Sequence, residues 1–231
     1  MSNKEEKKMK SVAKPALVPK LRFSEFRDAE EWDAKKLFEA CYVNPSNEGL
    51  PETFVYIDLE SVVAGKLISK TKISRENAPS RAQRQLKNGD VIYQIVRPYQ
   101  RNNFFCNFDD NNHYVASTGY AQLRSFGESK FLYQLVHTDD FVNKVIAKST
   151  GSNYPAIKSS DLAEIGIVIP QLPEQQKIAD CLSSLDERIT AEAQKLDMLK
   201  AHKKGLMQQL FPAEGKTLPK LRFPGLAGPW K

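Results

Sequence analysis

The sequence has little cysteine or histidine and no long apolar run. Its three cysteines, Cys41, Cys106 and Cys181, are far apart and form no CxxC pair, so we expect reduced thiols rather than a disulfide framework. The three histidines are equally isolated, which argues against a zinc site. No stretch approaches the roughly 18 apolar residues of a membrane span, and the N-terminus lacks the apolar segment of a signal peptide. We therefore expect a cytoplasmic protein that does not enter a membrane.

Catalytic motifs are missing as well. The sequence has no phosphate-binding GxxxxGK[ST] loop, no GxGxxG motif after a strand and no GxSxG elbow. The nearest approach to NPPY is Asn44-Pro45-Ser46-Asn47, which lacks the aromatic residue that would stack on a flipped base. We expect a non-catalytic binding protein with no cofactor of its own. The alternative is a lone nuclease or methyltransferase fragment, which would show activity when purified.

Positive charge is concentrated in one stretch of an otherwise balanced chain. Residues 24–172 hold 17 basic and 19 acidic side chains, but residues 66–101 hold nine basic and two acidic ones. Such a local excess is what the phosphate backbone of a nucleic acid attracts. On charge alone, a solvated basic surface explains the stretch equally well.

A short repeat organises the chain. PKLRF occurs at residues 19–23 and again at 219–223, and each copy is followed by one of the two tryptophans, Trp32 and Trp230. The repeat indicates one full unit of a repeating design, followed by the start of a second unit. We expect a disordered basic tail over 1–18, a folded domain over 19–172, a long helix over 173–211, and a linker or second-repeat start over 212–231.

The folded domain mixes strand and helix patterns. Short β-prone runs separated by turn residues such as Lys87–Asp90 predict strands within 53–59, 90–96, 104–108, 114–118 and 165–170. Apolar residues near helical spacing predict helix within 127–148 and 159–164. The expected fold class is α+β, with one long coiled-coil helix after the domain.

The long helix carries a heptad pattern. Its apolar positions alternate in steps of four and three, with Glu192 and Lys203 at the two missing positions, and the predicted seam is Ile178, Leu182, Leu185, Ile189, Leu196, Leu199, Leu206 and Leu210. About 37 residues at roughly 1.5 Å each give a helix about 55 Å long. This stripe needs a partner helix, and the alternative is a helix packed against its own domain.

These features together resemble a known family. The segment IVIPQLPEQQKIADCLSSLDERI (167–189), the opening PKLRF with its tryptophan, and residues 78–102 are similar to type I restriction–modification specificity subunits. The resemblance implies double-stranded DNA and methyltransferase subunits as partners, with a restriction subunit as a further one. It places S-adenosylmethionine on the methyltransferase. Family members usually carry two recognition domains and two antiparallel helices, so one domain and one helix suggest a half-length form that dimerises to read a palindromic split target.

Candidate DNA contacts fall into three groups. Arg97, Tyr99, Arg101, Asn102 and Asn103 follow a predicted strand and combine groups that read base edges. Phosphate contacts are expected from Lys70, Lys72, Arg75, Arg81 and Arg84. A second polar loop supplies Lys148, Ser152, Tyr154 and Lys158. The alternative function is a coiled-coil scaffold or tether that does not read DNA.

Overall fold

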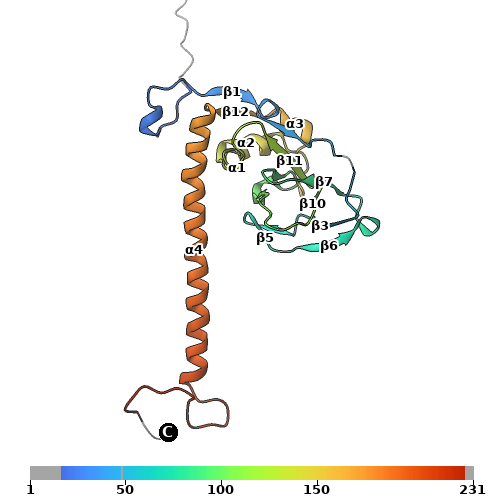
Figure 1. Ribbon diagram of the computed structural model, residues 1–231. Helices are drawn as coiled ribbons and strands as arrows, with labels where there is room; N and C mark the ends of the chain where they lie inside the picture. The colour runs from blue at the N-terminus through green and yellow to red at the C-terminus, as the bar shows by residue number, and fades with distance from the viewer. Residues whose placement is uncertain (1–16, 48, 227–231) are drawn as a thin grey trace, which may run out of the picture. The chain divides into compact units, whose positions relative to one another are not determined.

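The computed structural model describes residues 17–47 and 49–226. Contacts divide the chain into two units, Met1–Asp180 and Cys181–Lys231, and helix α4 (Leu172–Leu210) runs through the boundary between them (Figure 1). The expected tail over 1–18 falls almost wholly outside the described residues, as does Trp230 of the second repeat. Within the described residues, no helix is both long and apolar enough to cross a bilayer.

The central sheet of the first unit is antiparallel. Its strand order is β2-β11-β8-β9, with bounds Cys41–Val43, Tyr120–Ser125, Val91–Gln94 and Phe104–Phe105. Val91 and Tyr93 of β8 point to one core cluster, and Ile92 points to another. Successive side chains on a strand face opposite ways, so β8 is buried on both faces. This double burial explains why the sequence around β8 is almost continuously apolar.

The second four-stranded sheet is mixed. Its order is β6-β3-β10-β7, with bounds Thr71–Ser74, Thr53–Ile57, Tyr114–Ser117 and Ala82–Leu86. β10 pairs parallel with β3 and antiparallel with β7. Its side chains Val55, Ile57 and Tyr114 share a core cluster with Ile92 and Tyr120 of the central sheet. The two sheets therefore pack face to face.

Helices cover the other face of the central sheet. They are α1 (Ser129–Leu135), α2 (Asp139–Lys148) and α3 (Ser159–Ala163), and Phe131, Phe141 and Leu162 join the core cluster that contains Val91 and Leu123. The helix predicted over 127–148 is thus two helices, because the chain leaves α1 at Val136 and Thr138 caps α2 through its side chain.

Short elements complete the first unit. β1 (Asp33–Lys36) pairs antiparallel with β12 (Gly166–Ile169), and β4 (Val62–Val63) pairs with β5 (Lys66–Leu67). Four single turns of 3-10 helix occur at η1 (Ser24–Phe26), η2 (Leu37–Glu39), η3 (Arg75–Asn77) and η4 (Pro98–Gln100). Strands and helices in one domain, followed by a long helix, confirm the α+β class.

Helix α4 begins inside the first unit and becomes exposed along its length. Glu174, Gln175 and Ala179 are buried, whereas Ile189 is 67% exposed. Its 39 residues confirm the long helix that the heptad pattern predicts. In the second unit, the chain after α4 has no regular helix or strand among the described residues, and the Leu221 amide donates to the Gln209 carbonyl at 2.9 Å.

Candidate nucleic-acid interface

Two loops that are distant in sequence meet beside the end of β8. Val96 forms an antiparallel bridge with Ala156, and the Arg97 amide donates to the Pro155 carbonyl at 2.7 Å. The Arg97 guanidinium lies 4.1 Å from the centre of the Tyr154 ring, a cation–π distance. The structure therefore joins two of the three predicted groups of DNA contacts into one surface, which we call the paired-loop surface (residues 97–103 and 148–158).

The backbone of the first loop is held in an uncommon conformation. Arg97 and Arg101 both have positive φ, 55° and 54°, although neither is glycine. Such residues persist only where surrounding contacts hold them, and they cluster at functional sites. Between them, Pro98 is buried and Tyr99 is 51% exposed. The two strained residues thus present an aromatic side chain to solvent.

Contacts to the helices hold the far side of this loop. Arg101 Nη1 donates to the His137 carbonyl at 3.1 Å, and Nη2 pairs with Asp139. The Asn102 carboxamide oxygen accepts from the Ala64 amide at 3.1 Å. Arg101 and Asn102 therefore brace the loop as well as lying on it.

Asn103 is different from its neighbours. It is 1% exposed, and its Oδ1 accepts from the Gln94 amide at 2.8 Å, while its Nδ2 lies 3.3 Å from His137 Nε2. A buried amide with both ends engaged is positioned to hold the loop and has no surface to offer DNA. This corrects the prediction that Asn103 contacts bases.

The remaining predicted residues of the second loop are accessible. Lys148 is the last residue of α2 and Lys158 precedes α3, and both are exposed, as is Ser152. Tyr154 is 64% exposed even though its ring contacts Arg97. These side chains give the paired-loop surface its second row of polar and cationic groups.

Basic residues also follow the edge strand β6. Lys70 Nζ lies 3.4 Å from Asp110 and 5.9 Å from the centre of the Tyr114 ring, and Lys72 Nζ lies 3.3 Å from Asn112. Hydrogen bonds with Tyr114 and Asp110 raise the pKa of Lys70. The pKa of Asp110 is lowered to about 2, chiefly by the hydrogen bond from the Tyr114 hydroxyl. Both lysines are exposed, as phosphate contacts must be.

A basic cleft of about 500 Å³ lies near this edge. It gathers Arg75, Lys87, His113 and Arg124, which come from four separate segments. Of these only Arg75 is a predicted site residue, and no local pattern marks His113 or Arg124. Arg81 is exposed, whereas Arg84 is partly buried and burial lowers its pKa.

Asp90 explains how Arg124 is held. Arg124 Nε and Nη2 donate to the Asp90 carboxylate at 2.8 and 2.9 Å, and Gln122 Nε2 donates to it at 2.7 Å. The Lys87 amide donates to the same carboxylate at 2.8 Å. Asp90 is 1% exposed. The predicted turn at Lys87–Asp90 is therefore also the anchor of the cleft.

The motif around the start of α4 has a structural use. Arg22 Nε and Nη2 donate to the two carboxylate oxygens of Glu174 at 2.9 and 2.7 Å, and these side chains are 7% and 2% exposed. Gln175 donates to the Pro170 carbonyl at 2.9 Å and accepts from the Glu128 amide at 3.2 Å. We call this arrangement the helix-start joint. It fixes the opening segment and the first turn of α4 to the domain.

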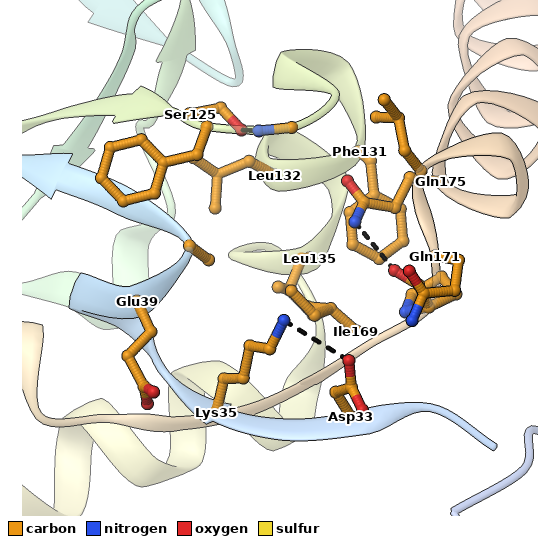
Figure 2. A pocket seen from close by; sticks show the side chains of 15 residues that line it. Asp33, Lys35, Glu39, Ser125, Phe131, Leu132, Leu135, Ile169, Gln171 and Gln175 are labelled. Carbon is orange, nitrogen blue, oxygen red and sulfur yellow. Dashed lines mark hydrogen bonds and ion pairs between the residues drawn. The ribbon is translucent and has the colours of Figure 1, made fainter. Parts of the chain in front are cut away.

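A hollow of about 210 Å³ lies beside the helix-start joint. Figure 2 shows its lining, with the Gln175 amide turned to the strand end and Lys35 paired with Asp33 at 3.4 Å. Its apolar part comes from Phe131, Leu132, Leu135 and Ile169. Since Asp33 and Glu39 outnumber the one lysine, this hollow does not suit a phosphate backbone.

A family comparison agrees with these features. The family model for the type I restriction modification DNA specificity domain matches residues 30–201. The chain belongs to this family. The matched range contains the paired-loop surface, the basic cleft and the first part of α4.

Relatives and solved structures support the assignment. The chain is 27% identical over 145 residues to the type I restriction enzyme HindI specificity subunit of Haemophilus influenzae, covering 61% of this chain and 31% of that protein. It is 27% identical over 103 residues to the EcoDI specificity subunit of Escherichia coli, covering 45% and 22%. The crystal structure of the HsdS subunit from Thermoanaerobacter tengcongensis matches with 31% identity and a TM-score of 0.59, covering 81% and 51%. The chain thus spans about half of that structure and less than a third of the HindI subunit.

The predicted seam of this specificity-family chain lies on α4. Leu182, Leu185, Ile189, Leu196 and Leu199 are between 37% and 67% exposed. Ile178 packs against the core of the first unit, and Leu206 and Leu210 are partly buried. A row of exposed leucine and isoleucine at heptad spacing is a surface that a partner helix can cover.

Proposed function

We propose that this chain is a non-catalytic DNA specificity subunit that reads one half of a bipartite target. The paired-loop surface supports this proposal best. It combines an exposed Tyr99, the stacked Arg97 and Tyr154, and exposed polar residues on a braced backbone, within a DNA specificity domain. Arginine and polar side chains are the groups that recognise base edges in the major groove.

The β6 edge and the basic cleft have a different role in this proposal. Lys70, Lys72, Arg75 and Arg81 are cationic side chains along one sheet edge and its turns, and Lys87 adds to them in the cleft. Contacts of this kind neutralise phosphates and set the position of the duplex without reading sequence. We therefore assign affinity to this edge and specificity to the paired loops.

Two copies pair through α4 in this proposal. One chain carries one recognition domain, and its heptad seam is exposed. A twofold pair reads two identical half-sites, so the target is a palindrome interrupted by a spacer. Methyltransferase subunits, which bind S-adenosylmethionine, are the proposed catalytic partners, and a restriction subunit is a further one.

The decisive experiment is to co-express the chain with its methyltransferase and map methylated adenines by single-molecule sequencing. We expect one motif with two inverted half-sites. An asymmetric motif would contradict the twofold pair, and methylation without sequence preference would contradict DNA reading. Light scattering of the chain, alone and with methyltransferase, gives the copy number independently. A stable monomer that binds one methyltransferase would remove the palindrome prediction.

A further inference from the structure

The opening PKLRF segment is held by the start of α4. Arg22 grips Glu174 with two hydrogen bonds, and its Nη1 and Nη2 also donate to the Ala29 and Glu30 carbonyls at 2.9 and 2.8 Å. Lys177 Nζ lies 5.5 Å from the centre of the Phe23 ring. An arginine followed by phenylalanine thus matches a carboxylate and an ammonium group three residues apart on one helix.

The same five residues recur at Pro219–Phe223 in the second unit. This copy is accessible, with Leu221 42% and Phe223 65% exposed. It also borders an apolar hollow of about 260 Å³ that includes Leu210 and Phe211. A segment with the same chemistry has the same ability to recognise a carboxylate and an ammonium group on a helix start.

The sequence contains one helix start of the required kind. Pro-Glu-Gln-Gln-Lys occurs once, at residues 173–177. From Glu174 to Leu210 the helix extends about 54 Å at roughly 1.5 Å per residue. The eight residues 211–218 reach at most about 28 Å when fully extended. The second copy therefore cannot return to Glu174 of its own chain.

We propose that Pro219–Phe223 of one copy binds the start of α4 in a second copy of this chain. There it takes the place that Pro19–Phe23 holds within the fold. Exchange of an identical element replaces each lost contact with the same contact, which keeps its energetic cost low. This contact goes beyond the proposed function, since it is separate from both DNA reading and the heptad seam.

Cysteine cross-linking between two full-length variants tests this contact. One chain carries Lys177→Cys and the other carries Phe223→Cys, both with Cys181→Ser because Cys181 is exposed while Cys41 and Cys106 are buried. After mild oxidation of the mixture we expect a disulfide-linked heterodimer. Pairing Phe223→Cys with Met198→Cys, another exposed α4 position, is the matched control, and we expect a yield about tenfold lower because no docking raises the local concentration.

Two further arms separate docking from collision. Adding Arg222→Glu to the Phe223→Cys chain should abolish the excess cross-link, because that side chain would then meet Glu174. A synthetic peptide of residues 216–226 should compete, whereas the same peptide with the Arg222→Glu change should not. A yield equal to the Met198→Cys control, or one insensitive to Arg222→Glu, overturns the proposal. Light scattering of the same samples shows whether pairing through α4 persists, so this failure is distinguishable from failure of the proposed pair.

Discussion

The two units use the same apolar side chains in opposite ways. In the first unit Leu123 is fully buried between strand and helix, whereas in the second unit Leu199 is 56% exposed on α4. The first unit has two sheets and three short helices to cover its leucines, and α4 is one helix. Burial of a leucine stabilises a fold by about 1.5–3 kcal/mol. The same side chain on α4 is available to stabilise an association.

The sharpest way to break this comparison is to charge the exposed seam. Leu185→Arg together with Leu199→Arg would place unpaired charges in a helix–helix contact, so we expect loss of the pair and a halved solution mass by light scattering. Gln194→Arg, between seam positions, is the matched control and should keep the wild-type mass. Near-UV circular dichroism of the first unit should be unchanged in both. A wild-type mass for the double variant would show that the seam is wrongly placed.

Within the first unit, the largest effect is expected at Asp90. Asp90→Ala removes the carboxylate that holds Arg124, Gln122 and the Lys87 amide, leaving buried donors without partners. We expect a loss of about 3–5 kcal/mol in the free energy of unfolding, measured with urea. Asp109→Ala, on an exposed aspartate, should change it by less than about 0.5 kcal/mol. Equal stabilities would mean that Asp90 does not anchor the cleft.

The two proposed DNA surfaces separate next. Tyr99→Ala should lower affinity for the cognate duplex by about 1–3 kcal/mol and narrow its advantage over a scrambled duplex. Lys72→Ala should weaken both duplexes about equally and reduce the slope of log K against log salt by about 1. Competition binding at several salt concentrations measures both. If Lys72→Ala altered discrimination and Tyr99→Ala did not, the assignments of reading and positioning would be reversed.

The smallest expected effect concerns Asp110 at the β6 edge. Its pKa is about 2 in the folded protein, chiefly because the Tyr114 hydroxyl donates to it, against an ordinary value of 3.8. A lowered carboxyl pKa adds stability above pH of about 4, and that stability is lost as pH falls toward 2. Tyr114→Phe should raise the pKa of Asp110, followed by carbon NMR of the carboxyl group. An unchanged pKa would point away from the Tyr114 hydrogen bond.

Sequence patterns predicted the elements whose burial is regular. The strands β3, β8, β10 and β12 and the helix α4 lie where alternation or heptads placed them. β7 and β11 were missed because polar residues interrupt their apolar pattern. On β11, Gln122 and Arg124 are stabilised by Asp90, which lies more than 30 residues earlier in the chain. Local periodicity cannot reveal a partner at that separation.

The candidate site shows the same limit. Composition marked both loops of the paired-loop surface, but not the contact between Arg97 and Tyr154 that unites them. Asn103 has the residue type of a base-reading group, and its burial assigns it to the scaffold. The Arg22–Glu174 pair joins positions 152 residues apart, although both segments carried the family resemblance. Residue type was therefore informative, and long-range contact decided its use.

The positive φ angles of Arg97 and Arg101 have a consequence for the thermodynamics of association. A loop that must be ordered by its ligand loses conformational entropy at that moment, at about 0.5–1.5 kcal/mol for each immobilised side chain. Here the Pro155 carbonyl, His137, Asp139 and buried Asn103 order the loop during folding. Calorimetric titration with the cognate duplex should accordingly show a small entropy loss from this loop, because its order is already part of the native state.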